Sequence, residues 1–465
     1  MSISQEIERI NTNIANAYTQ AGNKGATLPQ SQNSANLAET ISSIQIGGGT
    51  PVSVEEKDVN FYDYDGTRLY SYTLAEVQNL TELPALPSHT GLTCQGWNWT
   101  LADIKAEGKA TDVGAMYITD DGKTRLYIEI SEEGRMTVPL AFKQSIAYGV
   151  ELNWGDGSAT ETYHYGSSVN ITVSHTYSAI GKYMITLNPI DDCILTLGAN
   201  WNTYCIMGNY NNNTRVYMNM LYKAELGRNL GDIKDYAFVG CKSLTTITMP
   251  NTITGIGNYA FQYCYALKSL VVASATTNIG NNAFQNDNAL EKLILSNNIT
   301  TINTNVCSSC VSLKNITIPN KVTSIGNGAF YYCILSKIII PSATTTIGSG
   351  AFQTCNNLAK IILHNNITSI GNYAFQDCYA LSNIVMPNKT NSISSSLFQN
   401  CYGMAFYDFS EYISIPILES TNTFNNIPSD CKIIVPDSLY TNWIGSTNWS
   451  TYASYIIQKS DWDAL

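Results

Sequence analysis

The sequence predicts a mostly β, multidomain protein whose second half is a solenoid of stacked repeats. The main observation is a phenylalanine, once replaced by cysteine, that recurs eight times from Phe238 to Phe398 at steps of 22 or 23 residues. A fixed period in this range is typical of stacked repeats, each of which buries its apolar face only against its neighbours. The second observation is a pair of Asp-Gly turns, at 65–66 and 121–122, between alternating apolar segments, which favours β-hairpins.

The sequence patterns, together with the resemblances described below for the sandwich and the cap, divide the 465 residues into five expected segments. These are a helical stalk at 1–50, a small α+β, hairpin-rich module at 51–138, a β-sandwich at 139–192, the repeat solenoid at 193–435 and a cap at 436–465. A chain of this length has room for about three domains of ordinary size.

The stalk is expected to be a coiled coil that makes the protein a homotrimer. Its apolar residues follow a 4-3-4-3 spacing, and isoleucine at both core positions of a heptad favours trimers or tetramers over dimers. The predicted trimer interface is Ile3, Ile7, Ile10, Ile14 and Ala17. About two heptads are too short for independent stability, so the seam needs support from the assembly. An amphipathic helical hairpin packed on its own chain is the alternative.

Residues 14–44 read IANAYTQAGNKGATLPQSQNSANLAETISSI. This segment resembles an N-terminal segment of bacteriophage structural proteins, where it lies at the virion-proximal end of a fibre or spike. The resemblance implies attachment to a capsid, neck or tail protein through Lys24, Pro29, Asn33, Asn36 and Leu37. The glycine-rich residues 47–51 that come next are expected to be a hinge.

The module is expected to contain two hairpins, FYDYDGTRLY (61–70) and AMYITDDGKTRLYIEI (115–130). Two short helices between them are expected from capping boxes, at Thr73 with Glu76 and at Thr100 with Asp103. QGWNWTL (95–101) places two tryptophans on one side of an extended segment. The stretch resembles a module found ahead of similar repeats in phage and gut-bacterial surface proteins. The paired aspartates in its turns lack the spaced oxygen ligands of a calcium loop, so hairpin turns are the preferred interpretation.

The next segment contains VELNWGDGSATETY (150–163), SHTY (174–177) and GKYMITL (181–187). These motifs resemble those of a PKD-type β-sandwich, and members of that family are spacers and adhesive modules without catalysis. We expect Asp156 to accept backbone hydrogen bonds in a tight turn and His175 to pack nearby. A catalytic His-Asp pair is the sharper alternative.

In one repeat, Ala260, Phe261, Cys264 and Leu267 are spaced as on one face of a helical turn, and Leu270 with Val272 alternates as in a short strand. The cysteine recurs three residues after the ladder position at Cys241, Cys264, Cys310, Cys333, Cys355, Cys378 and Cys401, with Asp287 as the exception. The repeats, such as IGNYAFQYCYALKSLVV (256–272), resemble the leucine-rich repeat of the BspA family. The resemblance implies a parallel solenoid closed by a terminal cap with a polar-faced helix.

The cysteines are expected to act as small buried hydrophobes rather than as disulfides or metal ligands. The CxxC at 307–310 consists of ladder positions, so redox or metal use there is the less favoured alternative. We expect no cofactor, no metal site and no catalytic residues.

Composition narrows the function classes. The net charge of −11 argues against a nucleic-acid partner. Charged residues make up 13% of the chain and there are 30 tyrosines, so a neutral, aromatic surface is expected, which suits contact with a glycan or protein. MSISQEIERI lacks the pattern of a secretory signal, and no stretch is apolar for the roughly 20 residues that span a bilayer, so membrane insertion is not expected.

The leading hypothesis is a non-enzymatic fibre or spike subunit of a bacteriophage virion, assembled in the host cytoplasm, whose solenoid binds the host surface. A bacterial surface adhesin of the BspA type is the alternative. A glycan hydrolase is less favoured. It needs paired carboxylates on either side of the sugar bond, and the repeats offer only the isolated acids Asp287 and Asp377.

The candidate ligand-binding residues lie one, two and four positions after the ladder phenylalanine. They are Gln262, Gln376, Tyr263, Tyr332, Tyr265, Tyr379 and Tyr402. Tyrosine offers a large rigid contact area with one polar tip. The alternative for the glutamines is that stacked side chains bond one another along the rod.

Overall fold

The computed structural model describes residues 57–166, 169–197, 204–209 and 213–465. The chain divides into two compact units, Met1–Lys57 and Asp58–Leu465, and every described residue except Lys57 belongs to the second. The expected stalk, with its trimer-interface residues at 3–17 and its virion-attachment residues at 24–37, lies outside the described residues. The coiled coil and the trimer therefore stay predictions.

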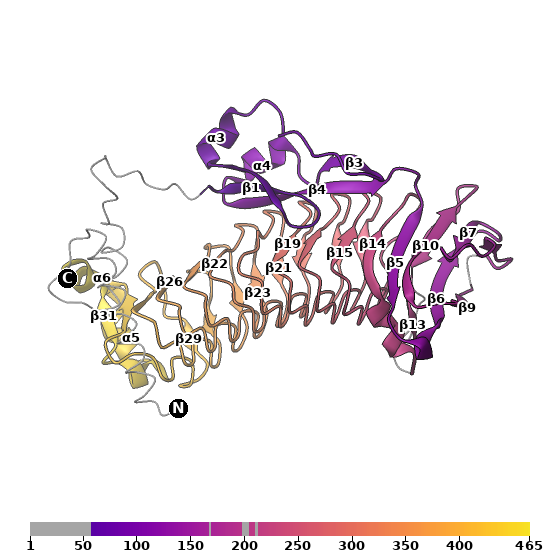
Figure 1. Cartoon of the computed structure of the whole chain (residues 1–465). Coiled ribbons are helices and arrows are strands. Elements are labelled where there is room, and N and C mark those ends of the chain that lie inside the picture. The colour runs from indigo at the N-terminus through magenta and orange to yellow at the C-terminus, as the bar shows by residue number, and fades with distance from the viewer. Residues whose placement is uncertain (1–56, 167–168, 198–203, 210–212) are drawn as a thin grey trace, which may run out of the picture. The chain divides into compact units, whose positions relative to one another are not determined.

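The second unit begins with the small α+β module, drawn in indigo and purple in Figure 1. Its sheet has the order β2-β1-β4-β3, with β1 antiparallel to β2 and parallel to β4. The elements are β1 (Val59–Tyr62), β2 (Arg68–Tyr72), α3 (Leu74–Asn79), β3 (Leu92–Trp97), α4 (Leu101–Glu107) and β4 (Thr111–Thr119). Both helix starts are confirmed, because the Thr73 and Thr100 side chains accept hydrogen bonds from the N–H groups three residues on. The hairpin at 61–70 is confirmed as well.

The hairpin predicted at 115–130 is wrong. Its turn forms, with Gly122 at a φ of 74°, but β4 and β5 (Thr124–Ile130) enter different sheets. The reason is that both edges of each strand are already paired. β4 lies between β1 and β3, while β5 lies between β10 (Gly181–Pro189) and β14 (Leu221–Glu225). The expected boundary at 138/139 therefore falls within the next domain.

That domain is a sandwich of two sheets, with orders β15-β14-β5-β10-β7-β8 and β11-β6-β9. Its further strands are β6 (Thr137–Gln144), β7 (Val150–Asn153), β8 (Glu161–Thr162), β9 (Ile171–Thr176), β11 (Leu195–Leu197) and β15 (Thr246–Thr248). Both sheets bury alternate side chains in one core, such as Leu126, Leu140 and Ile185. A sandwich is thus confirmed, whereas its PKD type stays a prediction. Because β11 belongs to it, the expected solenoid start at residue 193 is too early.

The connection from the sandwich to the solenoid contains short elements. They are β12 (Tyr204–Cys205), β13 (Gly208–Asn209) and η2 (Asn213–Met220), while η1 (Glu133–Arg135) lies within the sandwich between β5 and β6. The solenoid itself starts where β14 pairs in parallel with β15, so that one sheet continues from the sandwich into the coils.

Two rows of short parallel strands run along the solenoid (Figure 1). Row 1 consists of β15, β17 (Ser269–Val271), β19 (Lys292–Ile294), β22 (Lys337–Ile339), β24 (Lys360–Ile362), β26 (Asn383–Val385), β28 (Phe406–Asp408) and β30 (Lys432–Val435). Row 2 consists of β16 (Gly255–Ile256), β18 (Asn278–Ile279), β20 (Thr301–Ile302), β21 (Ser324–Ile325), β23 (Thr346–Ile347), β25 (Ser369–Ile370), β27 (Ser392–Ile393) and β29 (Ile417–Leu418). Equivalent residues of neighbouring coils pair in register, which confirms the parallel solenoid.

The helical turn predicted around the ladder phenylalanine is wrong. In the coil of Phe261 the residues two before and two after it, Tyr259 and Tyr263, have φ values of 56° and 65°. The Phe261 N–H donates to Ala283 O of the next coil at 2.8 Å instead of to its own turn. A chain with these left-handed residues cannot continue as an α-helix, yet it still places alanine, phenylalanine and cysteine inside.

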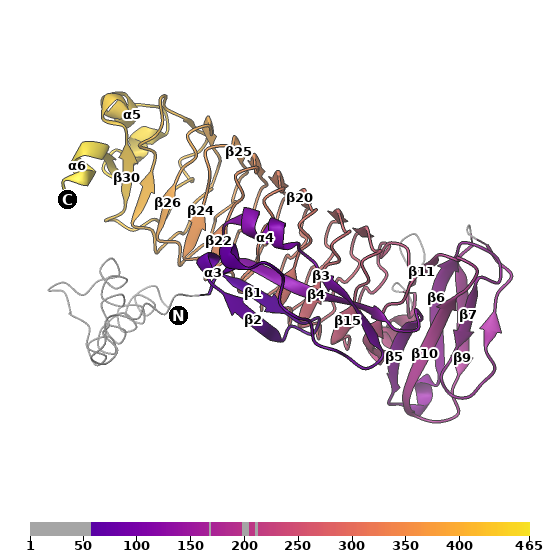
Figure 2. The same cartoon turned by 90° about the horizontal axis from the view of Figure 1, so that it is seen from above.

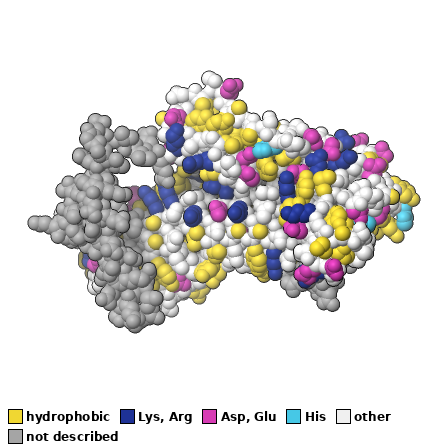
Figure 3. Space-filling model, in the orientation of Figure 1, with side chains coloured by type: hydrophobic (Ala, Val, Ile, Leu, Met, Phe, Trp, Pro, Cys, Tyr) yellow, Lys and Arg dark blue, Asp and Glu magenta, His cyan; other side chains and the backbone are white. Residues whose placement is uncertain are grey.

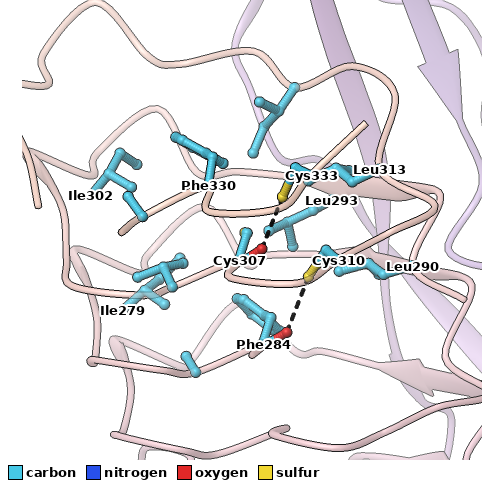
Figure 4. Packing of buried hydrophobic residues seen from close by; sticks show 14 of the residues in the cluster. Ile279, Phe284, Leu290, Leu293, Ile302, Cys307, Cys310, Leu313, Phe330 and Cys333 are labelled. Carbon is cyan, nitrogen blue, oxygen red and sulfur yellow. Dashed lines mark hydrogen bonds between the residues drawn. The ribbon is translucent and has the colours of Figure 1, made fainter. Parts of the chain in front are cut away.

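The interior is a set of stacked columns. The ladder phenylalanines are fully buried, and successive rings, such as Phe352 and Phe375, stack with centroids 5.7 Å apart. Figure 4 shows the interruption of this stack at Cys307, between Phe284 and Phe330. The ladder cysteines are buried, as predicted, and several also donate their S–H to a carbonyl of the preceding coil, for example Cys355 Sγ to Phe330 O at 3.1 Å. Burial raises the pKa of the Cys355 thiol to about 12, which keeps this donor protonated.

A glycine after several of the row 2 isoleucines allows the coils to approach closely. A Cβ built on Gly348 would lie 2.5 Å from Asn327 N, and one on Gly371 would lie 2.5 Å from Ser349 N. Such contacts are with backbone atoms and cannot be relieved by a side-chain rotation, so these positions need glycine for lack of space.

The cap is confirmed as the end of the solenoid, but it is not a single polar-faced helix. It contains η3 (Asp437–Leu439), α5 (Tyr440–Ile444), η4 (Trp449–Tyr452), β31 (Ile456–Gln458) and α6 (Lys459–Asp463). β31 extends row 1 by pairing in parallel with β30. Trp443 and Trp449 are buried against Phe409. The open end of the core is therefore closed by an aromatic cluster and one more strand.

The module lies on the outer face of row 1, where β4 contacts β15, β17 and β19. Asn98 Nδ2 donates to Val272 O and Leu295 O at 3.2 and 3.1 Å, and Trp99 Nε1 donates to Leu295 O at 2.8 Å. Gly114 lies so close to Val271 that an added Cβ would be 2.4 Å from that side chain. Figure 2 shows that the module covers the first part of row 1 and leaves β24 and β26 clear.

Candidate ligand-binding face

Tyrosines gather on the turns that lead from row 2 to row 1. In the coil of Phe261 they lie two residues before it, two after it and four after it, at Tyr259, Tyr263 and Tyr265. We call the set the tyrosine edge: Tyr236, Tyr259, Tyr263, Tyr265, Tyr331, Tyr332, Tyr373, Tyr379 and Tyr402. Each ring lies at least partly on the surface because the inward positions of the turn are filled by alanine, phenylalanine and cysteine.

Five of these tyrosines adopt a backbone conformation that bulky residues seldom occupy. Tyr236, Tyr259, Tyr263, Tyr332 and Tyr373 have φ values between 56° and 65°. In other coils the equivalent positions are mostly glycine or asparagine, such as Gly240, Gly328, Gly350, Asn282 and Asn286, which tolerate this region. For other L-residues the left-handed conformation costs roughly 1–2 kcal/mol. Tyrosine is therefore unfavourable for folding at these five positions.

The rings form small groups along the edge. Tyr263 and Tyr265 have centroids 6.0 Å apart, with Lys242 Nζ 5.5 Å from the Tyr265 centroid. Tyr379 and Tyr402 of adjacent coils stack at 5.4 Å. Tyr332 is 48% exposed and Tyr402 54% exposed. Coils are about 4.8 Å apart, so the three coil steps from Tyr265 to Tyr332 span about 15 Å, and one extended ligand can contact several groups.

Two phenol groups of this edge act as neutral hydrogen-bond donors. Partial burial, with smaller effects of Tyr263 and Asp287, raises the pKa of Tyr265 above its ordinary value. Burial and the nearby Asp377 do the same for the pKa of Tyr379. Both hydroxyls stay protonated at neutral pH and can donate to an acceptor while the ring faces make apolar contact.

The candidate glutamines have partners within the solenoid. Gln262 Nε2 donates to Gln285 Oε1 at 2.6 Å, and Gln353 Nε2 donates to Gln376 Oε1 at 2.7 Å. Gln376 in turn donates to Gln399 at 3.2 Å. These bonds match the alternative in which stacked glutamines hold neighbouring coils together, so we leave Gln262 and Gln376 out of the tyrosine edge.

Sequence reasoning found Tyr263, Tyr265, Tyr332, Tyr379 and Tyr402, and the structure places all five on one edge. It missed Tyr331 and the three tyrosines that precede the phenylalanine by two residues, Tyr236, Tyr259 and Tyr373. The rings of Tyr236 and Tyr259 stack with centroids 4.9 Å apart. The signal was present, because these three stand at one repeat position, two residues before the phenylalanine. The spacing of the buried residues is interpreted as a helical turn, and that interpretation gives no indication of the unfavourable φ of these tyrosines.

The His-Asp pair of the sandwich lies in a tight turn. His175 Nε2 is 2.7 Å from Asp156 Oδ2, and Ser158 N–H donates to Asp156 Oδ1 at 3.0 Å. Hydrogen bonds from Ser158 and His175 lower the pKa of Asp156. The His175 ring stacks on buried Trp154 at 5.1 Å. These contacts fit the turn-forming role expected for the pair.

The aspartates of the first hairpin are also engaged in the turn. Asp63 accepts from Tyr64 N–H and lies 2.8 Å from His89 Nε2, while Asp65 accepts from Thr67 N–H. Within the described ranges no group of three or more His, Cys, Asp or Glu side chains is arranged to hold a metal ion. All twelve cysteines carry free thiols, and only Cys94 is exposed.

Two further properties bear on what the surface can contact. On the face shown in Figure 3, Lys and Arg side chains are interspersed with Asp and Glu and form no broad patch of one sign. No helix in the described part of the chain has the length and apolar character needed to cross a bilayer.

Comparison with known proteins identifies the repeats. Residues 213–335 and 323–441 match the family described as BspA type Leucine rich repeat region (6 copies). The resemblance drawn from the repeat motif is thereby confirmed for the solenoid. The match includes neither residues 14–44 nor the motifs at 150–187.

Several solved structures are similar to this chain. A leucine-rich repeat protein from Bacteroides ovatus has 19% identity over 50% of this chain and 76% of that chain, with a TM-score of 0.28. A leucine rich cell surface protein from Faecalibacterium prausnitzii has 20% identity over 57% and 93%, with a TM-score of 0.30. The T. pallidum Leucine Rich Repeat protein has 20% identity over 41% and 75%, with a TM-score of 0.26. No curated protein matches the chain.

Proposed function

We propose that this chain, whose residues 213–441 form a repeat region of the BspA type, is a non-enzymatic adhesive protein that contacts a surface glycan or protein through the tyrosine edge. The observation that carries the proposal is the presence of five tyrosines in the left-handed region on an exposed turn. Folding does not require a bulky residue at these positions, and tyrosine strains the backbone there. We infer that the tyrosines are retained because they contact a ligand.

The chemistry of the edge suits recognition. Ring faces offer apolar contact to sugar C–H groups or aliphatic side chains, and the protonated hydroxyls of Tyr265 and Tyr379 offer donors. The solenoid holds these rings on a rigid backbone, since each coil is bonded to the next. Little conformational entropy is then lost on binding.

The experiment is a binding screen of the full-length protein against immobilised oligosaccharides and extracellular proteins. We expect wild type to bind at least one surface, and the double variant Tyr379→Ser/Tyr402→Ser to bind it at least about tenfold more weakly, because aromatic contacts are enriched among the residues that dominate binding energy. The control is Tyr148→Ser/Tyr165→Ser, which removes two exposed tyrosines from the sandwich. Because Tyr148 is also left-handed, with a φ of 57°, this control tests the position on the edge and not the backbone strain. Equal losses in the two variants would contradict the assignment of the edge.

A second candidate is a fibre or spike subunit of a bacteriophage virion. It is favoured by the resemblance of residues 14–44 to phage structural proteins and by the heptad seam at 3–17. Under this candidate the protein is a homotrimer of about 153 kDa, three times 51.0 kDa, joined to a capsid, neck or tail protein by its N-terminus. Light scattering that shows a monomer would remove it. The tyrosine edge would bind the host surface under either candidate.

A further inference from the structure

Row 1 has an outer face that is separate from the tyrosine edge. Along each row 1 strand the second residue points into the core and the first and third point outward, as in β24, where Ile361 is buried between Lys360 and Ile362. The first outward column contains Lys292, Lys337 and Lys360. The second contains Val271, Ile294, Ile339, Ile362, Val385, Asp408 and Ile434.

The chain itself covers this face at both ends. At one end the module buries Val271 and Ile294, and Lys292 Nζ is 2.7 Å from Asp112 Oδ2 and 4.4 Å from the centroid of the Tyr62 ring. At the other end α6 contacts β30, and Trp462 packs on Phe406 at 5.1 Å.

Between these covers the face is open. We call this stretch the open row: Lys337, Ile339, Lys360, Ile362 and Val385. Val385 is 52% exposed, and both lysines are exposed. Among the described residues, neither lysine has a carboxylate within ion-pairing distance. Figure 2 shows β24 and β26 between the module and the cap.

We propose that the open row is a docking site for an extended, acidic segment of another protein that lies along the rod as β4 does. The covered part of the same face shows the chemistry that fits. An extended strand crosses the coils there, its Asp112 pairs with Lys292, and its Gly114 packs on Val271. Lys337 and Lys360 are the equivalents of Lys292 without such a partner, so a carboxylate-bearing segment supplies what is missing.

The size and character of the open row restrict the partner. From the coil of Thr317, which bonds Asp112 N–H, to that of Asp408 there are four coil steps, or about 19 Å. An extended segment of about six residues spans this distance. The β-branched side chains of the row carry no hydrogen-bonding groups for sugar hydroxyls, which favours a polypeptide with alternating apolar and acidic residues over a glycan.

The test uses full-length protein and a fluorescein-labelled peptide of about eight residues with alternating aspartate and valine, long enough to span the row. A second peptide replaces the aspartates with lysines. Fluorescence anisotropy is measured on wild type, on Lys337→Glu/Lys360→Glu and on the control Lys321→Glu/Lys389→Glu. The control lysines are exposed on other turns and bond only asparagines, and both variants change the net charge equally.

We expect the aspartate peptide to bind wild type saturably and the lysine peptide not to bind. The open-row variant should weaken binding at least about tenfold and the control by less than about twofold, since only the first removes charges at the contact. Val385→Asp should also weaken peptide binding, because the new carboxylate would have to lose its water and would repel the aspartates of the peptide. No binding to wild type, or equal losses in both double variants, would overturn the proposal. Self-association of the free protein that Val385→Asp abolishes would show instead that a second copy occupies the row.

Discussion

Strain in the tyrosine edge can be measured by comparing Tyr332→Asn with Tyr402→Asn. The two rings are similarly exposed, at 48% and 54%, so each substitution loses a similar amount of packing, about 1 kcal/mol for a half-buried large side chain. They differ in backbone conformation, because Tyr332 has a φ of 57° and Tyr402 is not in the left-handed region. The Tyr332 N–H donates to Gln353 O of the next coil at 2.9 Å, which holds this φ in the variant.

Asparagine tolerates the left-handed region, so Tyr332→Asn should regain about 1 kcal/mol of strain that Tyr402→Asn does not. We expect Tyr402→Asn to lower the free energy of unfolding by about 1 kcal/mol and Tyr332→Asn to leave it nearly unchanged. Urea unfolding followed by circular dichroism measures both values. Equal losses, or a larger loss for Tyr332→Asn, would refute the argument that these tyrosines are retained against a folding cost.

Further predictions concern the core, the sandwich and the stalk. Phe330→Ala should cost about 3–5 kcal/mol in urea unfolding, because Phe330 is fully buried and stacks on Phe352, whereas Gln353→Ala should cost about 0.5–1.5 kcal/mol for its bond to Gln376. The lowered pKa of Asp156 means that its contribution to stability is complete above about pH 4. That contribution is lost as the pH falls toward the folded-state pKa. Asp156→Asn should therefore make the melting temperature fall less steeply as the pH is lowered below about 4. An unchanged pH dependence would exclude this role. Ile7→Asp/Ile10→Asp should convert the predicted trimer to a monomer in light scattering, and a trimer that persists would place the interface elsewhere.

The repeat columns could be predicted because the same physical requirement recurs in every coil. Phe261, Cys264 and Leu267, like the equivalent residues of other coils, are buried in the shared core. The period of 23 residues therefore indicates them without a structure. The turn conformation could not be predicted in this way. The spacing of these residues fits an α-helical turn as well as a turn with left-handed residues at Tyr259 and Tyr263, and the choice is made by hydrogen bonds to the next coil.

The arrangement of the first domains depends on contacts between residues far apart in sequence. Nothing in residues 115–130 indicates that β4 pairs with β1 and β3 while β5 pairs with β10 and β14. Likewise the pairing of Asp112 with Lys292 spans 180 residues. The Lys-Ile-Ile sequence shared by β22 and β24 is readable in the sequence, but only the position of the module shows which part of row 1 is open.

The most direct test of the tyrosine edge is a footprint of the bound ligand on the full-length protein. Tyrosines are nitrated with and without the strongest binder from the screen, and the modified residues are identified by mass spectrometry. We predict protection of Tyr265, Tyr332, Tyr379 and Tyr402, with Tyr148 and Tyr165 of the sandwich reacting as in the free protein. Protection of Tyr148 and Tyr165 with full reaction along the edge would contradict the account and place recognition in the sandwich.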